Sequence, residues 1–433
     1  MVTHDRRARA ATELRPATAG RAAYANLAPV AQYIPSWVQD LIRREENERP
    51  AVGYSAYLPF ILLAGLVIRL GLIPLTNGYD FHTFVLETKA ALAGRDLYDM
   101  SRPLKAPWAY FPLCFDMYLG LGWIAQHSPW GFDAVFPLLG KFPVIAADLL
   151  VGGLIYRALH TRGHDDKIAL TGACFYVFNP FVLYNGAFYG RFDAIALALL
   201  LLALEFYRSR WFSLLFALSI AAKTFPLFLL PLLAFGRDRQ PISKLAASVV
   251  LVPLLSLPYI MTDLRGLLAH LAYSRPIPGR LSWYSLLIEN HWLTQKQLAP
   301  LAALGFIVVY PFALLLFVKS PLYVKAAAAT TLFLVLSNVV YEQYLLWPLP
   351  FLIIVGLHYR SRIALGLVFL CTLAGLLENE ETWKPTRFHY HLVPTPSVPL
   401  NVALAVCVVV AALIWRFSRW KAHLPSIQSA AIT

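Results

Sequence analysis

The chain has 433 residues, of which 58% are hydrophobic and only 14% are charged. A soluble domain usually carries nearly twice that share of charge to solvate its surface, so this composition excludes an ordinary soluble globular protein. The formal net charge of +13 comes from basic residues clustered between apolar runs, a pattern that suits contact with anionic lipid better than a nucleic-acid groove.

The apolar runs predict the fold class. A helix that crosses about 30 Å of hydrocarbon needs about 20 apolar residues. The sequence therefore predicts an all-α integral membrane protein, a polytopic bundle of about 11–13 transmembrane helices with a large outer loop that carries amphipathic helices. The expected helices lie near 55–75, 141–157, 168–188, 193–207, 211–235, 245–260, 299–317, 324–340, 343–358, 362–378 and 399–416.

The polar stretches predict how the chain is divided. Residues 1–50 are expected to form a basic, partly disordered cytoplasmic tail, because they lack the continuous apolar segment of a signal peptide. The expected regions after it are a catalytic transmembrane module at 51–260 with an outer loop at 76–111, an outer loop at 261–298, a C-terminal transmembrane module at 299–416 and a cytoplasmic tail at 417–433.

Basic residues predict which helix ends face the cytoplasm. Short loops rich in lysine and arginine, such as those around Arg157 and Arg360, stay on the cytoplasmic side. All of the basic loops lie on the cytoplasmic side only if two apolar segments do not cross the membrane as single helices. Residues 112–126 are too short to span and are expected to be re-entrant or interfacial. Residues 211–235 are expected to break near Lys223 and to line a cavity.

Asp80 is the first candidate for chemistry. It opens the first outer loop, directly before an amphipathic helix that is expected to end near Gly94. Its carboxylate could cap this helix, or it could act on a substrate. The two roles are compatible, because a carboxylate held at a helix start is well oriented.

Three charged residues lie within or between later apolar runs. Arg191 and Asp193 separate two runs, where they could interact with each other, snorkel to the interface or contact a substrate. Lys223 lies in the middle of a 25-residue apolar run, where an unpaired lysine costs about 2.5–3.5 kcal/mol. Lys223 is therefore predicted to face a cavity or a charged partner.

The outer loops supply the remaining candidates. Arg275 and Arg280 could clamp an anionic group, or they could belong to a solvated loop. Glu342 interrupts two apolar runs, where it marks either a turn at the headgroup boundary or a second carboxylate near the outer face.

An ordered series of short motifs resembles the polytopic glycosyltransferases of the GT-C superfamily, and among them the mannosyltransferase I family of glycosylphosphatidylinositol assembly and its bacterial relatives. The likeness covers about residues 55–350. That family opens its first loop with Asp-x-Asp-Tyr-His, so Asp80 matches the second acid and Gly78 replaces the first. The motifs are Gly78-Tyr79-Asp80-Phe81-His82, Tyr110-Phe111-Pro112, Gly140-Lys141-Phe142, Asp148-Leu149-Leu150, Phe178-Asn179-Pro180, Lys223-Thr224-Phe225-Pro226 and Gln343-Tyr344-Leu345-Leu346-Trp347.

The resemblance implies a GT-C fold and the transfer of a sugar, with mannose as the expected sugar, from a polyprenyl-phosphate donor to a lipid or glycan acceptor on the extracytoplasmic face of the cell membrane. A polyprenyl phosphate leaves as a stable anion, so a general acid is not needed and one carboxylate suffices. Asp80 is the expected general base, and inversion without metal or cofactor is expected. The expected substrate-binding residues are Tyr79, His82, Arg191, Asp193, Lys223, Arg275, Arg280 and Glu342.

A lipid or solute transporter is the main alternative. Charges such as Arg69, Asp116, Asp148 and Lys223 would then mark a pathway through the membrane. The halves of the chain show no inverted repeat, which many transporters have. An assembly subunit without activity is a third alternative, because Gly78 replaces an acid. The expected partners are the polyprenyl-linked donor, the acceptor and membrane lipids, and nucleic acid is not expected.

Overall fold

The computed structural model describes residues 54–75, 79–99, 108–236, 239–271, 282 and 284–377, and every regular element among them is helical. The expected helix at 399–416 and both expected tails lie outside these residues. The helices are α4 (Leu58–Leu72), α5 (Tyr79–Leu92), α6 (Leu113–Gln126), α7 (Phe132–His160), α8 (Asp166–Val177), α9 (Pro180–Leu183), α10 (Asp193–Glu205), α11 (Phe212–Ala222), α12 (Leu230–Ala234), α13 (Ile242–Leu255), α14 (Leu257–Leu271), α15 (Tyr284–Glu289), α16 (Gln295–Leu315), α17 (Leu322–Leu336), α18 (Leu349–His358) and α19 (Arg362–Leu377). Short turns link them: the 3₁₀ turns η1 (Tyr54–Tyr57), η2 (Ile73–Leu75), η4 (Phe225–Leu229) and η5 (Glu342–Leu346), and the π-turn η3 (Tyr184–Phe188).

The described helices confirm a polytopic all-α membrane architecture, with more breaks than the sequence pattern predicts. In this part of the chain, three segments are long and apolar enough to cross a membrane: Tyr54–Leu75, Phe132–His160 and Lys296–Leu315. The number rises to five if each of two bent pairs, Asp166–Val177 with Pro180–Phe188 and Ile242–Leu255 with Leu257–Leu271, is counted as one span. Several other apolar helices are only 10–17 residues long.

Proline accompanies the sharpest of these breaks. The chain bends by 84° between α13 and α14, where Pro253 and Pro258 flank the turn. A proline lacks the backbone N–H that would continue the helical hydrogen bonds. The expected helix at 245–260 is therefore interrupted: α13 ends at Leu255, and the amphipathic helix α14 follows it.

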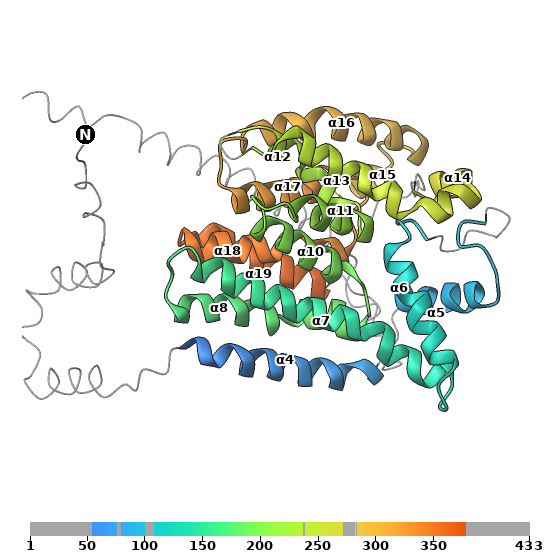
Figure 1. Cartoon of the computed structure of the whole chain (residues 1–433). Coiled ribbons are helices and arrows are strands. Elements are labelled where there is room, and N and C mark those ends of the chain that lie inside the picture. The colour runs from blue at the N-terminus through green and yellow to red at the C-terminus, as the bar shows by residue number, and fades with distance from the viewer. Residues whose placement is uncertain are drawn as a thin grey trace, which may run out of the picture. The chain divides into compact units, whose positions relative to one another are not determined.

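Contacts between loops that are distant in the sequence define two opposite ends of the described helical bundle. Figure 1 shows α4, α7 and α8 running side by side, with α5 and α6 at one end of them. At the other end Arg157 pairs with Glu205, and His164 contacts His358 at 2.7 Å. We call this the basic end, because it carries Arg157, Arg162, Lys167, Lys244, Lys319, Arg360 and Arg362. We call the opposite end, which carries Asp80, Arg191, Lys223 and Glu342, the site end.

The expected break near Lys223 is present, whereas the re-entrant or interfacial placement of residues 112–126 stays a prediction. Helix α11 ends at Ala222, Lys223 has an extended backbone, and η4 with α12 returns the chain to the basic end. There the buried Lys325 donates hydrogen bonds to the carbonyl oxygens of Leu232 and Phe235 at 3.0 and 3.2 Å. Helix α6 has only 14 residues and packs against α5 and α7.

A buried ion pair joins α4 to α7. Arg69 Nε lies 3.4 Å from Asp148 Oδ2, and both side chains are fully buried. Arg69 also donates to the carbonyl oxygens of Gly65 and Val177 at 3.2 and 3.0 Å, and the Tyr176 hydroxyl donates to Asp148 at 3.4 Å. The pair therefore fastens α4, α7 and α8 to one another.

Replacement of Asp148 with alanine should lower the free energy of unfolding by about 3–5 kcal/mol, because it leaves the Arg69 charge buried and unpaired. The double variant Arg69→Met, Asp148→Leu should regain most of that loss, since no charge then remains buried. Denaturant-induced unfolding in mixed micelles measures both. A loss below about 1 kcal/mol for Asp148→Ala would show that the pair does not stabilise the bundle.

Candidate active site

Arg191 is the centre of the charged cluster at the site end. Its Nε donates to Asp80 Oδ2 at 2.7 Å, and its Nη2 donates to Glu342 Oε1 at 2.6 Å. These partners come from α5 and η5, which lie 111 and 151 residues away along the chain. A planar guanidinium suits this role, because its fixed N–H groups can hold two carboxylates at once.

The backbone before Arg191 has an unusual local structure that directs its side chain. The π-turn η3 precedes it, and π-turns occur often at functional sites. Gly190 follows with a φ of +72°, a conformation that favours glycine. The Arg191 N–H then donates to the Asn185 carbonyl oxygen at 3.2 Å, and its Nη1 donates to Asn185 Oδ1 at 3.5 Å.

Asp80 is the accessible member of the cluster. It lies in the first turn of α5, where the helix dipole favours a negative charge. Its side chain is 32% exposed, compared with 15% for Glu342 and 9% for Arg191. The expected amphipathic helix is confirmed, because Phe81 and Phe84 are buried and α5 ends before Gly94. A carboxylate with an exposed edge and a fixed cation is able to accept a proton from a bound hydroxyl.

Lys223 and Asp193 form a second, closed pair. Lys223 Nζ lies 2.5 Å from Asp193 Oδ1, and both side chains are almost completely buried. The Trp347 indole N–H donates to the same oxygen at 2.7 Å. Four aromatic rings surround the ammonium group at 5.2–5.7 Å from its nitrogen: Tyr110, Phe192, Tyr344 and Trp347. We call these four residues the aromatic cage.

The two ion pairs answer the question that the sequence left open about Arg191 and Asp193. The two residues do not pair with each other, nor do they snorkel. Each instead pairs with a charge from a different helical segment. Lys223 accordingly has the charged partner predicted for it, and that partner is Asp193.

Tyr98 follows α5 in the chain and contacts Tyr110 of the aromatic cage. Its hydroxyl donates to the carbonyl oxygen of Tyr110 at 2.9 Å, and its ring meets Tyr259 edge-on. Burial, together with the nearby Tyr259 and Asp116, raises the pKa of Tyr98 above its ordinary value. The hydroxyl therefore stays protonated and available as a donor.

The other predicted site residues are not joined to this cluster by any contact that the structure describes. His82 lies exposed on α5, the side chain of Tyr79 is outside the described residues, and so are Arg275 and Arg280 entirely. Within the described ranges no group of three or more His, Cys, Asp or Glu side chains could hold a metal ion.

Several residues of the site were missed in the sequence. Asn185 and Tyr189, whose ring lies 4.6 Å from the Arg191 guanidinium carbon, belong to the polar run before Arg191 and could have been found there. Tyr110 belongs to the quoted Tyr110-Phe111-Pro112 motif, but the sequence does not indicate that the rings of Tyr110 and Phe192 surround Lys223, because aromatic residues are common throughout this chain.

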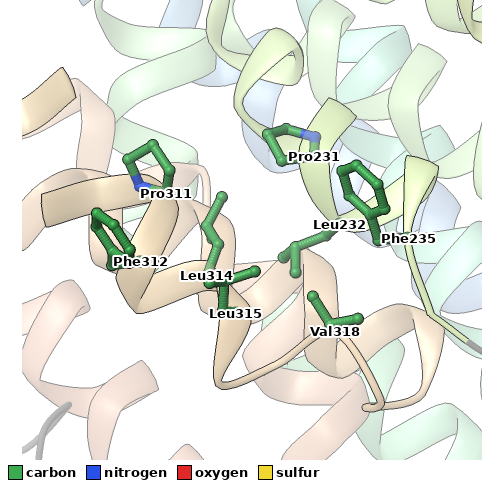
Figure 2. A pocket seen from close by; sticks show the side chains of 8 residues that line it. All are labelled: Pro231, Leu232, Phe235, Pro311, Phe312, Leu314, Leu315 and Val318. Carbon is green, nitrogen blue, oxygen red and sulfur yellow. The ribbon is translucent and has the colours of Figure 1, made fainter. Parts of the chain in front are cut away.

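An apolar hollow of about 160 Å³ lies elsewhere, between α12 and α16 (Figure 2). Its lining includes Phe235 and Val318, which adjoin the basic end. No charged side chain lines it, so it is not the site of a reaction between polar groups. The lining residues are Pro231, Leu232, Phe235, Pro311, Phe312, Leu314, Leu315 and Val318.

Replacement of Gly190 with alanine should disturb the site more than a change at a comparable glycine. A Cβ on Gly190 would come within 3.0 Å of Phe81 Cγ, whereas a Cβ on Gly94, which has a φ of +80°, would meet nothing within 4 Å. Gly94→Ala should therefore cost only the conformational strain, about 1–2 kcal/mol. Gly190→Ala should cost about 1–3 kcal/mol more because of overpacking. Equal unfolding free energies for the two variants would contradict this account.

A comparison with known protein families finds a match over the middle of the chain. The sequence model of Glycosyltransferase family 87 matches residues 135–341, a stretch that includes Arg191, Asp193 and Lys223 but neither Asp80 nor Glu342. The chain matches no curated protein. Family 87 is one of the GT-C-type glycosyltransferases, the superfamily that the motif series resembles. By its helical membrane architecture and this match over just under half of its length, the chain is similar to the membrane glycosyltransferases of the GT-C type.

Proposed function

We propose that the protein transfers a sugar, with mannose as the first candidate, from a polyprenyl-phosphate donor to a lipid or glycan acceptor on the extracytoplasmic face of the membrane. The observation that carries this proposal is the partly exposed Asp80 carboxylate, held at 2.7 Å by the buried Arg191 guanidinium. The Asp80 carboxylate can accept a proton, and the Arg191 guanidinium can balance the negative charge of a phosphate.

The proposed reaction is a single displacement. The acceptor hydroxyl oxygen forms a bond to the anomeric carbon of the sugar while the bond from that carbon to the phosphate oxygen breaks. Asp80 takes the proton of the acceptor hydroxyl, and the polyprenyl phosphate leaves with the bonding electrons. Because acceptor and leaving group occupy opposite faces of the carbon, the anomeric configuration inverts.

Charge balance assigns the other residues. Arg191 offers N–H groups for the oxygen that becomes negative on the leaving phosphate, as preorganised donors do in other transferases. Glu342 holds Arg191 from the other side and can accept hydrogen bonds from sugar hydroxyls. Lys223 and Asp193 neutralise each other inside the aromatic cage, where they support the wall of the site. Roles for Tyr79, His82, Arg275 and Arg280 in substrate binding stay predictions.

The distribution of charge supports the proposed side of the membrane. The basic end carries the exposed lysines and arginines of the short loops, and such loops face the cytoplasm. The opposite, site end would then face outward, where polyprenyl-linked sugars are used instead of nucleotide sugars.

Replacement of Asp80 with asparagine tests the proposed base. The variant keeps the size of the side chain but cannot take the proton, so sugar transfer should fall by about 10²–10⁴-fold. The assay uses purified protein in proteoliposomes with radiolabelled polyprenyl-phosphate mannose or glucose and a membrane lipid extract as acceptor.

Asp133→Asn is the matched control for Asp80→Asn. Asp133 also lies in the first turn of a helix and pairs with a cation, Lys89, at 2.6 Å, but its side chain is 80% exposed. Its replacement should leave transfer unchanged. If Asp80→Asn kept full transfer, the proposed mechanism would be wrong. If it moved labelled lipid across the vesicles without forming product, the transporter alternative would be favoured.

Replacement of Arg191 with lysine should lower kcat by about 10²–10³-fold, although the positive charge is kept. An ammonium group cannot reproduce the two N–H directions that reach Asp80 and Glu342 and leave a further N–H for the phosphate. Steady-state kinetics measures the effect. Wild-type kcat in Arg191→Lys would show that only the charge at this position is needed.

A further inference from the structure

The geometry points to Lys141 as a positioning residue that sets the distance between Asp80 and Arg191. This inference rests on the proposed function, because it assumes that these two side chains carry the reaction. Lys141 lies on α7, and its side chain is fully buried.

Lys141 joins three segments of the site end. Its Nζ donates to the Ile73 carbonyl oxygen at 3.2 Å and to the Phe188 carbonyl oxygen at 2.8 Å. The same nitrogen lies 5.3 Å from the centre of the Phe81 ring, a cation–π contact. One ammonium group thus contacts the start of η2, the π-turn η3 and the first turn of α5.

The Phe81 ring packs among Gly140, Gly190, Phe136 and Lys141, which we call the socket. The two glycines leave room for the ring because they have no Cβ. A Cβ on Gly140 would come within 3.1 Å of the ring, and a Cβ on Gly190 would come within 3.0 Å of Phe81 Cγ and 3.2 Å of Lys141 Cγ. Phe136 stacks against the ring at a centroid distance of 6.0 Å. Phe81 itself is fully buried, so the socket fixes it firmly.

Two residues of the socket region, Phe81 and Gly190, are sequence neighbours of the two charged residues Asp80 and Arg191. Asp80 directly precedes Phe81, and Arg191 directly follows Gly190. When the Phe81 ring packs against Gly190, the neighbouring side chains are brought within the 2.7 Å of their hydrogen bond. Lys141 contacts the Phe81 ring on one segment and the Phe188 carbonyl oxygen on the other. Its loss would therefore loosen the socket and change the distance between Asp80 and Arg191.

Lys325 provides a matched control within the same chain. It is also buried, and its Nζ donates to the carbonyl oxygens of Leu232 and Phe235 at 3.0 and 3.2 Å. It lies at the basic end, away from Asp80 and Arg191. Replacement of either lysine with methionine removes a buried ammonium from two carbonyl oxygens, and only Lys141→Met affects the socket.

The test compares Lys141→Met with Lys325→Met, each measured for unfolding and for sugar transfer per folded molecule. The two variants should lose similar stability. Lys141→Met should lower kcat by about 10²-fold with an almost unchanged KM for the donor, because a shift of about 1 Å between reacting groups costs that much. Lys325→Met should keep the wild-type kcat.

Two milder variants cover the case in which Lys141→Met does not fold. Lys141→Gln keeps an N–H donor and should recover part of kcat. Phe81→Leu should lower kcat through the same socket, and its effect should not add to that of Lys141→Gln, since both act on one contact. Additive effects, or equal kcat in all of these variants and Lys325→Met, would overturn the inference.

The outcomes separate this inference from the proposed function. Full transfer by Asp80→Asn would refute the proposed base, whatever Lys141 does. An inactive Asp80→Asn together with a wild-type kcat in Lys141→Met would refute only the positioning role.

Discussion

A charge inside an apolar bundle needs a partner, and this requirement shapes the site end. An unpaired guanidinium at the place of Arg191 would cost several kcal/mol, so the fold must bring carboxylates to it. Asp80 and Glu342 arrive from segments 111 and 151 residues away. The interaction that stabilises the junction of α5, η5 and the turn before α10 is thus the one that assembles the proposed active site.

The buried charges differ in how completely they are enclosed. Arg69 with Asp148 is fully buried, and Lys223 with Asp193 is nearly so. Both pairs neutralise themselves and hold helices together. The Arg191 cluster alone among these three has a partner with substantial exposure, Asp80 at 32%. That difference separates a structural ion pair from one that a substrate can reach.

The helix break and the candidate site residues could be predicted from the sequence. Which charged side chains pair with one another could not. The break near Lys223 followed from charge parity and helix length, and Asp80, Arg191 and Glu342 were all candidates. The partners of Arg191 could not be predicted. Arg191 does not pair with Asp193, two residues away, but with carboxylates on distant segments. Lys141 belonged to a recognised motif, but its contact with Phe81 exists only once α5 and α7 have packed.

The proposed active site can be located directly by determining the structure of the protein in nanodiscs with a polyprenyl phosphate bound. The phosphate should lie within hydrogen-bonding distance of Arg191, with the Asp80 carboxylate facing the space beside it. A phosphate bound instead among Arg157, Arg162 and Arg360 at the basic end would contradict the account.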